Sequence, residues 1–169
     1  MKQLDAGGWF PPEFSGETIP TLPETIVLCR DLGLGMNIEI KPNSGEEQAT
    51  AMAALATVES MLGWRGCETI GSVVFSSFKP AALETLQQEG PLWPRGFLLG
   101  ERRSNWLNEA QRLECVSFHP AAELLDQAET VDDIKAAGFL IYPYTVNDLE
   151  RASELLGWGV MRSLPTTHA

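Results

Sequence analysis

The chain has 169 residues, 44% of them hydrophobic and 21% charged, as expected of one globular domain with a buried core. Its formal charge of −11 disfavours nucleic acid as a partner, because such a surface repels a phosphate backbone. No apolar run approaches the roughly 18 residues of a membrane span, so we expect a cytoplasmic protein. The three cysteines lie near apolar residues without a CxxC pair, which indicates reduced, mostly buried thiols at Cys29, Cys67 and Cys115.

The amino-terminal part of the chain predicts a loop followed by a helix. Residues 1–20 are rich in glycine and proline and should form an ordered loop that exposes Trp9, Phe10 and Phe14. A helix is expected at 21–33, because Thr21 is a suitable N-cap, Pro23 falls in the first turn and Glu24 stands at the capping-box position.

Short apolar segments then alternate with amphipathic segments. The expected strands are 36–40, 73–75, 96–99, 115–118, 139–144 and 160–164, and the expected helices are 47–62, 80–88, 105–113, 126–137 and 148–156. This alternation indicates parallel strands joined by right-handed crossovers. Six strands fall about two short of a closed barrel of eight. An open doubly wound sheet would need no further units and is the structural alternative.

Polar residues gather where these strands end, which is where parallel βα folds place their chemistry. They are Glu39, Lys41, Ser76, Ser77, His119, Tyr144, Thr145 and Asn147. Alternation along a strand puts Glu39 and Lys41 on one face, the interior face if the sheet is a barrel. A hard cation with a phosphoryl group would use both, the carboxylate binding the metal and the lysine the phosphate. A solvated charge pair at a strand end is the alternative.

The other polar candidates are less specific. His119 closes an apolar strand, and it could be a ligand or proton-transfer group or a satisfied, partly buried histidine. Ser76 and Ser77 lack the G-x-S-x-G context of a nucleophile, so no serine chemistry is expected. The sequence contains neither a G-x-G-x-x-G before a helix nor a Walker motif, which gives no support for a nucleotide cofactor.

Several strings, in order, resemble the glycerophosphodiester phosphodiesterase family. LDAGGWFPPEFSGETIPTLPE is similar to the loop and helix before the third barrel strand of that family, and MNIEIKP to its third-strand motif. FSSF, RGFLL, SFHP and YPYTVND resemble the fourth to seventh strands at suitable spacing. The resemblance covers residues 3–160 and is nearest to the short bacterial cytoplasmic enzymes of the Ugp type.

This resemblance implies an α/β fold, an incomplete TIM (β/α) barrel of the PLC-like phosphodiesterase type, with about six of eight βα units. It implies a single partial domain over 1–169, with a divergent tail at 161–169. The implied reaction is the hydrolysis of a glycerophosphodiester to sn-glycerol 3-phosphate and an alcohol, with Mg²⁺ or Ca²⁺. Glu39 would be a metal ligand, Lys41 a phosphate contact, and the mouth would be lined by His119, Tyr144 and Asn147.

The chain also departs from the family pattern. The family's two catalytic histidines and two further acidic metal ligands lie in His-Arg-Gly and His-Asp motifs upstream of the matched segment, and neither His119 nor His168 stands at such a position. At the other end Met161–Pro165 replaces an Asp-Gly segment. The activity of this chain alone is therefore open, and an inactive remnant or binding module on the same scaffold is the alternative. Open barrel edges would favour self-association.

Overall fold

The computed structural model describes residues 3–10, 12–63, 73–102 and 104–160, and the chain divides into two compact units, Met1–Leu34 and Gly35–Ala169. The first unit holds a short 3-10 turn, η1 (Pro12–Phe14), and helix α1 (Leu22–Asp31). The loop exposes the aromatic side chains as predicted. Edge-to-face contacts, with ring centroids 4.4 and 5.7 Å apart, connect Trp9, Phe10 and Phe14.

Helix α1 begins with the capping box that the sequence predicts. The Glu24 amide donates to the Thr21 hydroxyl at 3.4 Å, and the Thr21 amide donates to the Glu24 carboxylate at 2.7 Å. Two of the amides that a helix start leaves without partners are thereby satisfied. The helix ends at Asp31, shortly before Gly33, whose φ of +65° suits glycine.

The second unit alternates strands and helices. Its elements are β1 (Met36–Glu39), α2 (Glu47–Leu62), β2 (Val73–Ser77), α4 (Pro80–Glu89), β3 (Arg95–Leu99), α5 (Trp106–Arg112), β4 (Ser117–Pro120), η2 (Ala122–Leu124), α6 (Ala128–Ala136), β5 (Leu140–Ile141) and α7 (Leu149–Gly157). None of the helices in the described ranges is both long and apolar enough to cross a membrane. The sixth expected strand lies beyond the described residues apart from Val160, as do Cys67 and His168.

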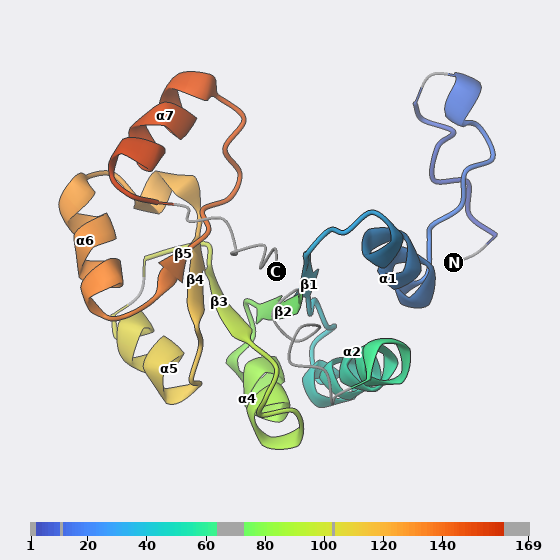
Figure 1. Ribbon diagram of the computed structural model, residues 1–169, viewed down its shortest axis with the longest axis horizontal. Coiled ribbons are helices and arrows are strands. Elements are labelled where there is room, and N and C mark those ends of the chain that lie inside the picture. Colours follow the sequence, from blue (N-terminus) through green and yellow to red (C-terminus); the bar gives the residue numbers. More distant parts are fainter. Residues whose placement is uncertain (1–2, 11, 64–72, 103, 161–169) are drawn as a thin grey trace. The chain divides into compact units, whose positions relative to one another are not determined.

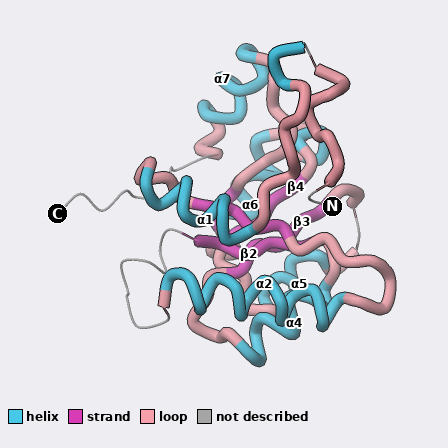
Figure 2. The backbone as a smooth tube through the Cα atoms, turned by 90° about the vertical axis from the view of Figure 1, so that its right-hand side faces the viewer, coloured by secondary structure: helices cyan, strands magenta, loops and turns pink. Residues whose placement is uncertain are grey.

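The strands form one sheet whose order follows the chain, β1-β2-β3-β4-β5, and all four pairings are parallel. A doubly wound sheet reverses its strand order at a switch point, and this sheet has no reversal. Helices α2 to α7 follow one another around the strands (Figure 1), and α2, α4 and α5 lie together on one side of them (Figure 2). The architecture is therefore an arc of a TIM barrel, and the doubly wound alternative is wrong.

The strand boundaries differ from prediction at β4. This strand begins at Ser117 instead of Cys115, because Glu114 has a left-handed φ of 51° and the Cys115 amide still donates to Ala110 at the end of α5. Cys115 is buried and Cys29 half-buried, both as free thiols. Burial raises the pKa of the Cys115 thiol to about 12, although the charge of Arg95 opposes this effect.

The two faces of the sheet have different contents. On the helix side Phe97 and Phe118 stack at 5.9 Å, and Phe118 contacts Trp106 of α5 at 4.4 Å. Side chains alternate along a strand, so the next residues in register, Gly96 with Ser117 and Leu98 with His119, point to the opposite face. That face corresponds to the barrel interior, and it carries the polar residues.

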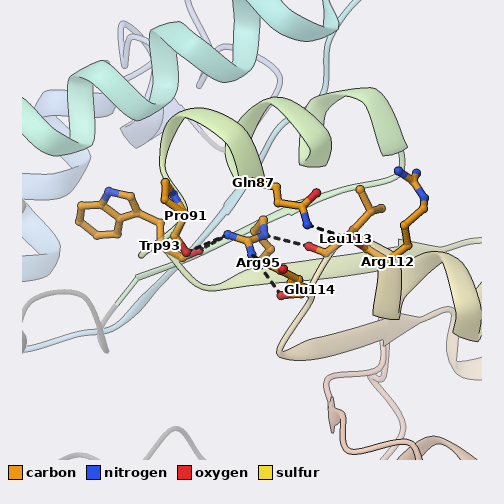
Figure 3. A network of polar contacts seen from close by, with 7 residues as sticks. All are labelled: Gln87, Pro91, Trp93, Arg95, Arg112, Leu113 and Glu114. Atoms are coloured by element: carbon orange, nitrogen blue, oxygen red, sulfur yellow. Dashed lines mark hydrogen bonds and ion pairs between the residues drawn. The ribbon is translucent and has the colours of Figure 1, made fainter.

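A buried cation, Arg95, lies at the amino end of β3 and bonds to the segments around it (Figure 3). Its guanidinium accounts for five hydrogen bonds of 3.0–3.3 Å, which reach the carbonyls of Pro91, Trp93, Leu113 and Glu114 and the Glu114 carboxylate. Burial lowers the pKa of Arg95, but a guanidinium stays charged in proteins. With five donors and five bonds, this side chain ties the loop before β3 to the end of α5.

Candidate active site

Glu39 and Lys41 lie at the carboxyl end of β1. Exposure alternates along this strand and continues to Ile40, which is 3% exposed, whereas Glu39 and Lys41 are exposed on either side of it. The two charged side chains therefore leave the face opposite Ile40, as the sequence predicts. Neither forms a hydrogen bond or an ion pair with a described residue.

Tyr144 follows β5, at the edge of the described sheet opposite β1, and its side chain extends over the ends of other strands. Its amide donates to Pro120 and its carbonyl accepts from Ala122, which extends the pairing of β4 and β5. Its ring meets Phe78, just after β2, edge to face at 5.7 Å. A Cβ added at Gly100, just after β3, would lie 3.5 Å from the Tyr144 hydroxyl. The side chain of Tyr144 thus lies against the residues that follow β2 and β3.

The electrostatics of Tyr144 connect it to β1 as well. Burial raises the pKa of Tyr144, and the negative charges of Glu39 and Glu123 raise it further. Both carboxylates must lie near enough to disfavour the tyrosinate. Glu39, Phe78, Gly100, Glu123 and Tyr144 therefore converge at the carboxyl end of the sheet, and the hydroxyl remains a hydrogen-bond donor at neutral pH.

His119 lies deeper on the interior face. It is 4% exposed, its Nε2 is 2.8 Å from the Ser117 hydroxyl, and its ring meets Tyr142 edge to face at 5.3 Å. A Cβ at Gly96 would lie only 2.5 Å from Nε2, so this position must be glycine for the ring to fit. Burial lowers the pKa of His119 to about 4. This histidine is neutral at physiological pH. Its environment is that of a satisfied, buried histidine, which was one of the two interpretations of the sequence.

Asn147 belongs to a neighbouring pocket of about 250 Å³ after β5. The pocket is lined by Ala122, Glu123, Thr145, Val146, Asn147, Asp148 and Arg151. Arg151 is occupied, because it pairs with Glu154 and donates to the carbonyls of Ala122 and Leu125. The Glu123 carboxylate has no hydrogen-bond partner among the described residues, so the pocket presents a free acceptor beside Tyr144.

The structure brings together Glu39 and Tyr144 and places Asn147 one pocket away, with His119 beneath. Phe78, Gly100 and Glu123 were missed from sequence, although each directly follows a strand or lies in the loop after one. Across the described segments no three His, Cys, Asp or Glu side chains form a metal-binding group. The Glu39 carboxylate is a hard oxygen donor, so it fits one side of a divalent cation without completing the cation's ligand set.

The comparisons with known proteins point to one family. Residues 1–161 match the family described as Glycerophosphoryl diester phosphodiesterase. Glycerophosphodiester phosphodiesterases of Bacillus subtilis and Caldanaerobacter subterraneus are 32% and 30% identical over 95% of this chain. The chain spans 58% and 63% of the lengths of these two relatives.

The solved structures agree with the arrangement of the sheet. A phosphodiesterase of Oleispira antarctica in complex with the product sn-glycerol-3-phosphate superposes with a TM-score of 0.84 at 34% identity, over 94% of this chain and 62% of that one. A phosphodiesterase of Galdieria sulphuraria, described as putative, reaches a TM-score of 0.75 at 21% identity, over 94% of this chain and 62% of that one. The second likeness concerns the fold alone.

Proposed function

Because the chain belongs to the glycerophosphoryl diester phosphodiesterase family, we propose that this protein acts in the hydrolysis of glycerophosphodiesters to sn-glycerol 3-phosphate and an alcohol. The observation that carries the proposal is the pair Glu39 and Lys41, which leave the interior face at the end of β1 without partners in the described structure. A carboxylate and an ammonium that share one face and do not pair with each other are free to bind a cation and an anionic oxygen. The product bound to the 34% identical Oleispira antarctica relative supports a phosphate ester as that group.

Each residue of the site has a role in this proposal. Glu39 would hold a divalent cation, Mg²⁺ or Ca²⁺, which supplies charge stabilisation at a phosphoryl oxygen. Lys41 binds a phosphate oxygen as a point charge. Tyr144, kept protonated by burial and by two carboxylates, donates a hydrogen bond to the diester. Asn147 and the pocket around it hold one of the two alcohol halves.

His119 has a supporting role in this proposal. Its neutral ring is 4% exposed, is hydrogen-bonded to Ser117 and packs against Tyr142 beneath the site. Proton transfer would come from the part of the relatives' length that this chain does not span, supplied by a longer form of the protein or by a second chain. The alternative, a binding or assembly module on an inactive scaffold, predicts no such complementation.

The test is the release of sn-glycerol 3-phosphate from glycerophosphocholine with Mg²⁺ or Ca²⁺. It is applied to this chain and to a chimera that adds the part of the Bacillus subtilis relative that the chain does not match. We expect the chimera to be active and Glu39→Gln to lower its kcat about 100-fold or more. Glu150→Gln, which changes an exposed carboxylate of α7, is the matched control. Inactivity of both proteins would favour the inactive scaffold, and an unaffected Glu39→Gln would remove Glu39 from the site.

Narrower expectations belong to the same proposal. We propose a cytoplasmic protein of glycerol and lipid metabolism, built as one partial barrel domain. We also propose that it self-associates through β1 and β5, the outer strands of the described sheet, because outer strands present unpaired amides and carbonyls. Sedimentation analysis over a range of concentrations tests the association, and a monomer throughout would contradict it.

A further inference from the structure

Two adjacent serines of β2 have opposite environments. Ser76 and Ser77 are both fully buried. The Ser77 hydroxyl donates to the Ile40 carbonyl at 2.6 Å and accepts from the Lys79 amide at 3.0 Å. The Ser76 hydroxyl is buried and forms no hydrogen bond within the described structure. The Ser77 hydroxyl therefore stabilises the fold from the helix side of the sheet. The Ser76 hydroxyl makes no such contribution.

A buried hydroxyl without a partner destabilises a folded protein by about 1–3 kcal/mol. Alanine would avoid this penalty at the same volume, and the preceding residues of the strand, Val73, Val74 and Phe75, are all apolar. Unsatisfied buried groups in folded proteins are rare and call for an explanation beyond packing. The explanation must involve a group that Ser76 can reach from the interior face.

The register identifies that group. Glu39 and Ser76 are Cα partners in the parallel pairing of β1 and β2, so their side chains leave the same face about 4.8 Å apart. On the other side the partner of Ser76 is Gly96, which has no side chain. Further along the row Ser117 is bonded to His119. Glu39 is the neighbour in this row that has unused acceptor oxygens.

We propose that Ser76 is a positioning residue for Glu39, whose carboxylate accepts a hydrogen bond from the Ser76 hydroxyl when the site binds its cation. This inference rests on the proposed function. A carboxylate that binds a metal through one oxygen is commonly held by a hydrogen bond to the other, and a charged acceptor makes this bond stronger than a neutral one. The exposed Glu39 side chain is free to turn toward β2, because it has no other partner in the described structure.

The test separates binding from stability. Calorimetric titration of the chimera with Ca²⁺ and with sn-glycerol 3-phosphate is combined with thermal unfolding of the 169-residue chain. We expect Ser76→Ala to weaken Ca²⁺ binding roughly tenfold while its Tm stays equal or rises, and Ser76→Thr to regain most of the affinity. Ser77→Ala should do the reverse, lowering Tm without changing Ca²⁺ affinity.

A second control is Tyr142→Phe, which removes another buried hydroxyl without a partner from the interior face. It should leave Ca²⁺ affinity unchanged. Unchanged Ca²⁺ affinity in Ser76→Ala, or a lower Tm, would overturn the role of Ser76. Failure of the unsubstituted chimera to bind either probe would instead overturn the proposed function, and with it this role.

Discussion

The two ends of the same sheet differ in whether their polar groups have hydrogen-bond partners. At the amino end, the five donors of Arg95 meet five acceptors. At the carboxyl end, Glu39 and Lys41 have no partner among the described residues, and the hydroxyl of Ser76 is buried without one. The first end is a completed structure, and the second keeps unused donors and acceptors.

This difference indicates that stability and chemistry depend on opposite ends of the strands. In a barrel of parallel strands the amino end serves stability, and the carboxyl end carries the site. Substitution of Arg95 should change the free energy of unfolding with little effect on ligand binding, and substitution of Glu39, Lys41 or Ser76 should do the opposite. Equal effects on unfolding and on binding in both groups of variants would show that the division is wrong.

The largest effect is expected for Arg95→Ala. It removes a side chain that is 3% exposed and leaves four backbone carbonyls without their donor. We expect a loss of about 3–5 kcal/mol in the free energy of unfolding, measured by urea denaturation.

The matched control for Arg95 is Arg102→Ala. Arg102 pairs with Asp126 at 3.0 Å, but both side chains are more than half exposed, and such a pair contributes about 0–1 kcal/mol. If the two variants lost the same stability, the amino end would not be the structural end of the sheet.

A smaller effect is expected on acidification, where His119 lowers the stability of the folded chain. Burial lowers the pKa of His119 from 6.5 to about 4, so between these values the unfolded chain binds a proton that the native chain excludes. Acidification through this window favours unfolding, by up to roughly 3 kcal/mol at its lower limit. Stability is regained as the pH rises above the unfolded value.

His119→Gln isolates this contribution, because glutamine is neutral throughout and can still meet Ser117. Carboxylates titrate in both proteins, so the quantity to measure is the difference in unfolding free energy between them from pH 7 to pH 4. We expect wild type to lose more stability than the variant on acidification. Parallel pH profiles would show that His119 is accessible to protons in the native state.

The sequence predicted most of the scaffold and part of the site, for reasons that differ by residue. Periodicity and capping are local, so the Thr21 helix start and the shared face of Glu39 and Lys41 were predictable. The start of β4 was not, because the left-handed turn at Glu114 has no glycine to mark it.

Neighbours across strands were the harder part. Phe78 and Gly100 join the site only because Tyr144 passes over β2 and β3, and sequence spacing does not report which strand ends a side chain crosses. Ser76 and Ser77 look alike in sequence. Their difference depends on which face each one occupies and on whether an acceptor lies there, which requires the register of β1 and β2.

The smallest effect is the most direct measure of how closely the carboxyl ends converge. The chain has two tyrosines, so Tyr142→Phe leaves Tyr144 as the sole source of tyrosinate absorbance. In this background Glu39→Gln should lower the pKa of Tyr144, because it removes a negative charge that opposes ionisation, and Glu123→Gln should do the same from the β4 side. Burial, the larger cause, would remain, so the pKa should stay above its ordinary value. Glu150→Gln should leave the titration unchanged, and an equally unchanged titration in Glu39→Gln would mean that β1 does not reach Tyr144.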